Sequence, residues 1–451
     1  MISVLTQSSQ SAIPPRARNR ATNSVLALSL TIVSALWSVA AFAQSWATVD
    51  DFSPDASAYA VKADASGNIF AAGAVKDSTG RYHAVVTKSG DGGTTWATSF
   101  DLPSEVDPSA SNGSAAYFAA IASAELSNGE RHVVVSGRNR RVYQTPGVLT
   151  GEWVTVRTKD SGASWEIIDR YYHPTYSLLS AETGPWGVAM DAAGTVHIAG
   201  VAEENVVTTK GKTTTTTLVR HWLIRSGIPN SSGTFDWTTK DIPFPTSKYH
   251  QTPNVLPKAA LCVGSDAYVV GGGGTDGNYW TVLKSSNRGV TWTTSDSFTM
   301  TQPDSPALAH AIAADASGNL YVAGAGMRVV QGVAYIDWMV RKGTPGGGSW
   351  TTLDRYPYPA GSAWARGVTV GTNGDLYVTG NANAGSDRWL TRKRSALTGS
   401  WTNDEYTHPS NLRTFGKAIT TSPSGSLFSA GVTYDASGYP ENWLVRRLLI
   451  P

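Results

Sequence analysis

Basic and aromatic residues recur at one position of a repeated sequence line, and their side chains could hold an anionic ligand. The line starts at a turn residue such as Asp64 or Asp315 and ends in Gly. Five residues before the turn, or at the analogous place in less regular copies, lie four basic and three aromatic residues: Tyr59, Phe118, Trp186, Lys258, His310, Arg366 and Lys417. Converging cations without acidic neighbours would bind carboxylate or sulfate groups, and aromatic faces would stack on sugar rings. The alternative is that these side chains only pack and hydrogen-bond between neighbouring sheets.

Catalysis at the same place would follow the residue types that are present. A polysaccharide lyase needs a His or Tyr base beside a uronate, and cations that stabilise the developing charge, here Lys258 and Arg366. The candidate bases are His310, His173, His250 and Tyr249. A glycosidase needs two facing carboxylates. The acidic residues available for that role share no register in the repeats: Glu182, Glu203, Glu204 and Glu405. A lyase is therefore favoured over a hydrolase, and whether the protein is an enzyme at all stays open.

The elements that must position these residues are repeats. Asp315-Ala-Ser-Gly-Asn-Leu-Tyr-Val-Ala-Gly324 shows the line most clearly. Seven copies end at Gly73, Gly137, Gly200, Gly271, Gly324, Gly380 and Gly431. Each copy follows a run of small and β-branched residues and precedes a strand that is mostly headed by Trp, a Gly turn and a further Trp strand. Four short strands per unit, separated by Gly, Asn and Asp turns, are typical of a β-meander.

The last repeat lacks its fourth strand, and the opposite end of the chain supplies a match. Ser45-Trp46-Ala-Thr-Val-Asp matches the fourth-strand line Ser349-Trp350-Thr-Thr-Leu-Asp. A ring in which the N-terminal strand completes the last sheet removes the open edges of a linear array. We therefore predict an all-β fold, a seven-bladed β-propeller of four-stranded antiparallel blades, over residues 44–451 as a single domain.

The turns between the third and fourth strands carry the motif Ser/Thr-x-Asp-x-Gly-x-Thr/Ser-Trp. It stands at Ser89 to Trp96 and Thr158 to Trp165, and with Asn for Asp at Ser285 to Trp292. The chain therefore resembles the Asp-box (BNR-repeat) propellers of the sialidase-like superfamily, and its repeated line resembles the SBBP repeats of secreted bacterial proteins. The resemblance implies ligand binding on the face where the innermost strands begin, opposite the Asp-boxes. No Arg-Ile-Pro motif of the sialidases occurs in the sequence, so sialidase activity is not expected.

The N-terminus predicts export. A basic stretch with Arg16, Arg18 and Arg20 precedes an apolar run of residues 25–40, and Ala41-Phe42-Ala43 has the form of a cleavage site. Residues 1–43 therefore read as a signal peptide, and we expect a secreted, periplasmic or cell-surface protein without a membrane span after cleavage.

Composition narrows the function further. Lys and Arg total 36 and Asp and Glu 34, so the whole-chain charge gives no reason to expect nucleic acid. The single Cys and the lone Asp in each turn suit neither a zinc nor a calcium site, and we expect no metal and no cofactor. The leading hypothesis is a monomer that binds an anionic glycan where the innermost strands begin, at the mouth of the central tunnel of the propeller. The alternatives are a polysaccharide lyase or glycosidase, and a scaffold that binds a protein partner.

Overall fold

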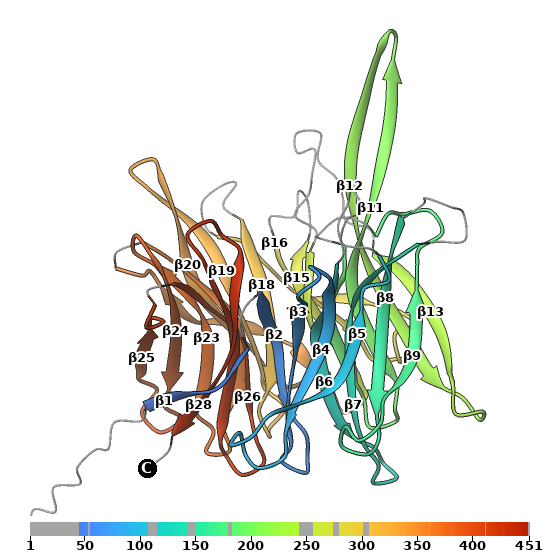
Figure 1. Ribbon diagram of the computed structural model, residues 1–451. Helices are drawn as coiled ribbons and strands as arrows, with labels where there is room; N and C mark the ends of the chain where they lie inside the picture. Colours follow the sequence, from blue (N-terminus) through green and yellow to red (C-terminus); the bar gives the residue numbers. More distant parts are fainter. Residues whose placement is uncertain are drawn as a thin grey trace, which may run out of the picture. The chain divides into compact units, whose positions relative to one another are not determined.

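The computed structural model describes residues 45–52, 55–106, 115–142, 149–178, 183–242, 256–273, 279–300, 306–359, 361–410 and 412–449. Residues 1–43, the predicted signal peptide, lie outside this part. The described chain from Ser45 forms seven four-stranded antiparallel sheets and a single 3-10 turn, η2 (Pro345–Gly347) (Figure 1). The predicted seven-bladed β-propeller is thereby confirmed.

Each blade is a meander whose first strand is innermost. The blades consist of β2 (Ala56–Ala63), β3 (Ile69–Lys76), β4 (Tyr82–Ser89) and β5 (Ala97–Pro103); β6 (Ala116–Glu125), β7 (Arg131–Val142), β8 (Leu149–Thr158) and β9 (Glu166–Tyr171); β10 (Pro185–Met190), β11 (Val196–Lys210), β12 (Thr213–Pro229) and β13 (Phe235–Ile242); β14 (Leu256–Val263), β15 (Asp266–Gly273), β16 (Tyr279–Ser285) and β17 (Thr293–Phe298); β18 (Ala307–Ala314), β19 (Leu320–Val330), β20 (Val333–Gly343) and β21 (Trp350–Tyr356); β22 (Ser362–Val370), β23 (Leu376–Asn383), β24 (Asp387–Arg394) and β25 (Trp401–Tyr406); and β26 (Arg413–Thr421), β27 (Leu427–Tyr434), β28 (Pro440–Leu449) and β1 (Ser45–Phe52).

Strand β1 closes the ring, as the sequence predicts. It pairs antiparallel with β28, from Ser45 opposite Leu449 to Phe52 opposite Trp443. The Asn442 amide also donates to Asp51 Oδ1 at 3.0 Å. The N-terminal strand therefore covers the edge that β28 would otherwise expose.

The core lies between blades, and its main contact joins a Trp of one blade to a Gly of the next. Six of the seven third strands carry a buried Trp at the same register: Trp153, Trp222, Trp280, Trp338, Trp389 and Trp443. Each indole packs against the Gly that ends the repeat of the next blade, so closely that a Cβ on this Gly would overlap the ring. A Cβ on Gly73, for example, would lie 2.7 Å from the Trp443 ring. This contact joins the seventh blade to the first.

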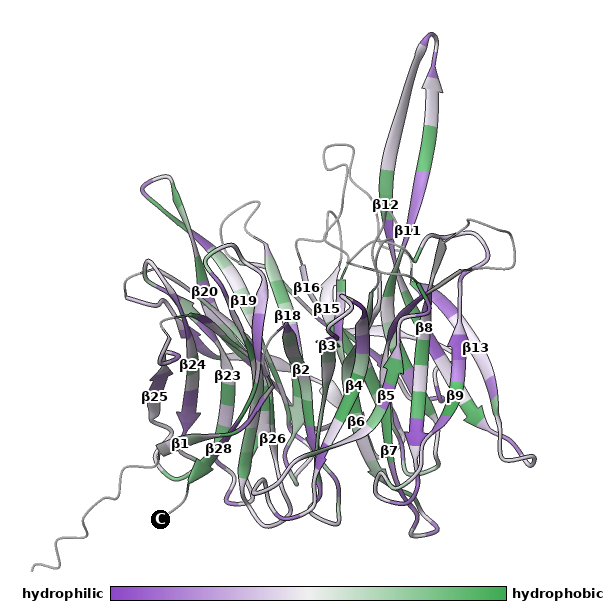
Figure 2. Ribbon diagram, in the orientation of Figure 1, coloured by the Kyte–Doolittle hydropathy of each residue, from purple (hydrophilic) through white to green (hydrophobic). Residues whose placement is uncertain are grey.

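Polarity along the strands fits this packing. In β8, valines alternate with Thr155 and Arg157 (Figure 2). Arg157 is nevertheless buried and is paired with Glu166. Buried cations at comparable places bridge blades: Arg225 in β12 binds Asp169 in β9 through two bonds of 2.6 and 2.8 Å. These buried cations of the third strands are thus paired with carboxylates of the fourth strands.

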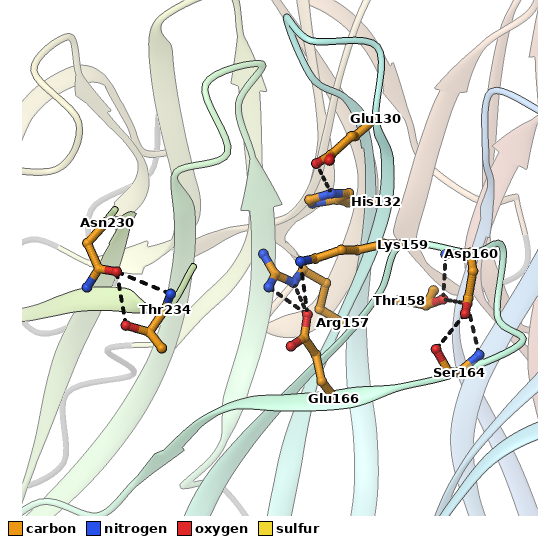
Figure 3. Close-up of polar contacts among 10 residues, drawn as sticks. All are labelled: Glu130, His132, Arg157, Thr158, Lys159, Asp160, Ser164, Glu166, Asn230 and Thr234. Carbon is orange, nitrogen blue, oxygen red and sulfur yellow. Dashed lines mark hydrogen bonds and ion pairs between the residues drawn. The ribbon is translucent and has the colours of Figure 1, made fainter. Parts of the chain in front are cut away.

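The outer turns are held by Asp and Asn side chains. Asp91 Oδ1 accepts the backbone N–H groups of Thr94 and Thr95, both at 2.9 Å. Asp160 Oδ1 accepts from the Thr158 hydroxyl and from the backbone N–H group of Ser164 (Figure 3). In the third blade, which lacks the motif, Asn230 accepts from the Thr234 backbone at 3.2 Å (Figure 3). These hydrogen bonds fix each turn between the third and fourth strands.

The hairpin of β11 and β12 rises far beyond its blade (Figure 1). Gly200 lies opposite Pro185, the first residue of β10, and the β11–β12 ladder continues to Lys210 opposite Thr213. The hairpin therefore extends past the end of the blade at which the innermost strand begins. Among the described residues, no helix is long and apolar enough to cross a membrane.

Candidate functional site

A β-bulge occurs at the same place in all seven innermost strands. In each strand one residue is skipped by the pairing with the second strand. The skipped residues are Tyr59, Ala119, Trp186, Lys258, His310, Arg366 and Lys417. A bulge leaves the extra residue unpaired and redirects its side chain. All seven residues line one central cavity of about 480 Å³. The structure thus brings together six of the seven residues singled out in the sequence.

The repeat-ending Gly makes room for the bulge. A Cβ on Gly380 would lie 1.9 Å from the carbonyl oxygen of Trp364, two residues before Arg366. The other six copies have the same contact, from Ser57 O at 1.9 Å for Gly73 to Gly184 O at 2.4 Å for Gly200. Any side chain at the Gly would push the inner strand away. The Gly that ends all seven repeats therefore allows the bulge, and the bulge directs the variable side chain into the cavity.

The prediction for the second blade was wrong. Ala119, not Phe118, occupies the bulge, and Phe118 is fully buried in the core between the first two blades. The first blade has Ala84 at the register where the others carry Trp. Gly137 of the second blade consequently meets Phe118 instead of an indole. Phe118 fills the space that a Trp at position 84 would have occupied.

Basic residues dominate the electrostatics of the cavity. Lys258, Arg366 and Lys417 line it at the bulges, Lys62 lines it further along the innermost strand of the first blade, and no Asp or Glu is found among its described lining residues. Arg366 Nε donates to Asn381 Oδ1 at 2.9 Å, which fixes the guanidinium. Burial, with Arg366 and Lys258 adding to it, lowers the pKa of Lys417 to about 7. Positive charge without a carboxylate nearby favours an anion in this space.

His310 does not add a positive charge to the cavity, although its residue type placed it among the basic residues. Its Nδ1 lies 2.8 Å from the carbonyl oxygen of Ala365, which can only accept, so Nδ1 carries the proton. Burial and the nearby charges of Arg366 and Lys258 hold the pKa of His310 well below its usual range. At neutral pH the imidazole is therefore neutral, with an unprotonated Nε2.

Two of the bulge residues that line the cavity, Tyr59 and Trp186, are aromatic. Tyr117 lies between two of the bulge residues, with ring centroids 5.9 Å from Tyr59 and 5.8 Å from Trp186. The Lys258 ammonium lies 4.7 Å from the centre of the Trp186 ring. The aromatic residues and the cations of the cavity are therefore in direct contact, through Trp186 and Lys258. Tyr117, two residues before Ala119 on the same strand, is not among the described lining residues, but its ring packs against both aromatic residues that are. It was not singled out in the sequence.

A second cavity of about 420 Å³ adjoins the first. Lys258, His310 and Arg366 line both of them. The rest of its described lining is mostly apolar and includes Leu308 and Trp364. A ligand larger than a single anion thus finds adjoining space beside the cations.

The other candidate bases are not part of this site. His173 is absent from the described cavity lining, and its Nδ1 accepts the backbone N–H groups of Thr175 and Tyr176 at 3.2 and 2.9 Å. Its ring stacks on Tyr176 with centroids 4.1 Å apart. His173 therefore holds a loop together. Tyr249 and His250 lie outside the described residues.

The carboxylates considered for hydrolysis are engaged in other contacts. Glu203 is 4% exposed and pairs with Arg220 at 3.1 Å. Glu204 pairs with His221, and Glu405 pairs with Arg388. Glu182 lies outside the described residues. Within the described chain, no group of three or more His, Cys, Asp or Glu residues is arranged to hold a metal ion.

Comparison with known proteins gives likeness in fold only. No protein-family model and no curated protein matches the chain. Among solved structures, the NanB sialidase from Streptococcus pneumoniae is 11% identical, with a TM-score of 0.43 over 90% of this chain and 70% of that chain. The GH93 alpha-L-arabinofuranosidase of Fusarium graminearum, in complex with arabinobiose, is 11% identical, with a TM-score of 0.44 over 88% of this chain and 98% of that chain. A PL25 ulvan lyase is 12% identical, with a TM-score of 0.42 over 71% and 81%.

Proposed function

We propose that the protein binds an anionic glycan at its central cavity. One observation carries this proposal: three cations, each displaced by a bulge, line a space without a carboxylate among its described lining residues. Carboxylate and sulfate groups would pair with Lys258, Arg366 and Lys417. Tyr59 and Trp186 would offer their faces to sugar rings. The adjoining, mostly apolar cavity would hold the next sugar unit of the glycan.

A panel of uronate and sulfated oligosaccharides of defined length tests this function by titration calorimetry. Arg366→Ala and Lys417→Ala should each weaken binding by about tenfold or more, because charge-assisted hydrogen bonds contribute roughly 1.5–3 kcal/mol. Lys240→Ala removes an exposed lysine outside the described cavity lining and serves as the matched control. Unchanged affinity in both cavity variants would remove the proposal.

The geometry favours binding over elimination chemistry through His310. Its Nε2 is free to accept a proton, but a base with a pKa far below neutral accepts one weakly. A lyase acting on uronate polymers would nevertheless produce unsaturated uronates, which absorb in the ultraviolet. Absorbance recorded over the same panel separates binding from cleavage, and a rise that His310→Gln abolishes would overturn this preference.

We further propose that residues 1–43 are a signal peptide and that the protein acts outside the cytoplasm as a monomer. The basic stretch, the apolar run and the Ala-Phe-Ala site support export. We also propose that the turns at Asp91, Asp160 and Asn287 are Asp-boxes, and the hydrogen bonds of their side chains support this assignment. Mass spectrometry of exported protein tests the cleavage after Ala43.

A further inference from the structure

Lys417 is a cation without a counterion in the described part of the cavity. The bulge in β26 displaces it, and its Nζ lies 5.4 Å from the ring centre of Phe415 and 5.8 Å from that of Tyr434. The charged groups that act on it are Arg366 of β22 and Lys258 of β14, both positive. Burial and the two neighbouring cations both disfavour a protonated amine.

The consequence is an amine that is available for chemistry. With a pKa of about 7, roughly half of the Lys417 side chains carry a free lone pair at neutral pH. An ordinary exposed lysine has a neutral fraction of well under one in a thousand at that pH. A neutral lysine amine in a pocket beside other cations is a nucleophile for carbonyl carbon. The neighbouring Arg366 and Lys258 can hold a carboxylate on the same molecule.

We propose that Lys417 forms a reversible imine with a small 2-oxo acid that enters the central cavity. The inference rests on the proposed anion site, because Arg366 and Lys258 bind the carboxylate. The Lys417 nitrogen attacks the adjacent carbonyl carbon, and a carbon–nitrogen bond forms. The carbonyl oxygen leaves as water after taking up both amine protons, and the product is a carbon–nitrogen double bond. No oxidant or reductant is needed, and hydrolysis reverses the step.

Lys62 is the internal rival. It also lines the cavity, and burial lowers its pKa. It differs in its surroundings, because it reaches a third cavity at the other end of the tunnel, where Asp64, Glu125 and Asp315 contribute to the lining. The negative charge of these carboxylates repels an incoming acid. The geometry therefore points to Lys417 and not to Lys62.

Reductive trapping tests the inference on the full chain. The protein is incubated with pyruvate and cyanoborohydride at pH 7, and modified lysines are mapped by peptide mass spectrometry. We expect modification at Lys417 to be roughly tenfold or more faster than at the exposed Lys240, because of the difference in neutral amine. The rate should rise between pH 6 and pH 8. Acetone, which lacks the carboxylate, should be trapped much more slowly than pyruvate.

Matched variants separate the possible outcomes. Lys417→Arg keeps a cation but removes the amine, so trapping should disappear, whereas Lys240→Arg should behave like the wild-type protein. Arg366→Ala should slow trapping, because the carboxylate loses its partner. Modification at Lys62, or modification spread over exposed lysines, overturns the inference. Wild-type protein that binds anionic oligosaccharides but is not trapped refutes the imine alone. Wild-type protein that does neither also refutes the proposed function.

Discussion

At the scale of single residues, the site is one backbone position that recurs in seven blades and carries six different residue types. Aromatic residues occupy it in the first and third blades, Ala in the second, and basic residues and His310 in the last four. The sequence predicts most of this ring because the spacing from bulge to turn is constant. It fails in the second blade, where β6 has 10 residues against 8 in β2. A shift of one residue along a strand turns a side chain to the opposite face, and Phe118 consequently lies in the core.

This correction can be tested with two neighbouring substitutions. Phe118→Ala should lower the free energy of unfolding by about 3–5 kcal/mol, since it leaves a cavity in the core. Ala119→Lys should leave the fold intact and add a cation to the central cavity, so that sulfated oligosaccharides bind more tightly. Denaturant unfolding and calorimetry measure the two effects. Stable protein after Phe118→Ala, together with unfolding after Ala119→Lys, would reverse the assignment.

The protonation of Lys417 predicts how binding depends on pH. Its pKa of about 7 lies below that of an exposed lysine, so the positive charge appears as the pH falls through 7. An anion that binds the protonated form should bind more tightly at pH 6 than at pH 8, by at most about tenfold for one titrating group. In Lys417→Arg the charge is permanent, and this dependence should disappear. Stronger binding at pH 8 than at pH 6 would contradict the assignment.

At the scale of elements, the Gly that ends each repeat has two roles. It receives the Trp of the preceding blade in six of the seven blades, and it allows the inner strand to approach and bulge. The sequence predicts the Gly, the Trp and the strand order, because these follow from a repeated local pattern. It does not show that Gly and Trp of neighbouring blades touch, or that the bulge depends on the Gly, since both facts need contacts between repeats.

Gly380→Ala tests this dual role. The new Cβ would lie 1.9 Å from Trp364 O and 3.0 Å from the Trp338 ring, so the strand must move. We expect a loss of about 3 kcal/mol or more in the free energy of unfolding, together with weaker anion binding, because Arg366 is displaced. Gly90→Ala is the matched control, since its Cβ would meet only Asn68 Oδ1 at 3.6 Å. Equal stability of the two variants would show that Gly380 is not needed for the bulge.

At the scale of the whole molecule, closure of the ring holds the seven bulge residues around one cavity. β1 is distant in sequence from β28 but completes its sheet, and the Trp443–Gly73 contact lies at the same junction. The matching fourth-strand line around Trp46 makes this closure predictable from sequence. The charges in the cavity are less predictable, because the neutral His310 and the depressed pKa of Lys417 arise only when seven strands meet.

Loss of β1 should therefore affect the whole protein. A variant that begins at Asp55 leaves β28 as an open edge, and we expect a lower melting temperature and association through that edge. Light scattering and thermal unfolding compare it with a variant that begins at Gln44. Identical melting and scattering would show that the ring does not depend on β1.

The central claim is that an acidic sugar binds among Lys258, Arg366 and Lys417. A crystal structure of the protein with a sulfated uronate oligosaccharide from the binding panel tests it most directly. We predict carboxylate or sulfate oxygens within hydrogen-bond distance of Arg366 and Lys417, and a sugar ring against Tyr59 or Trp186. An oligosaccharide bound elsewhere on the blades, with the central cavity free of it, would contradict the claim.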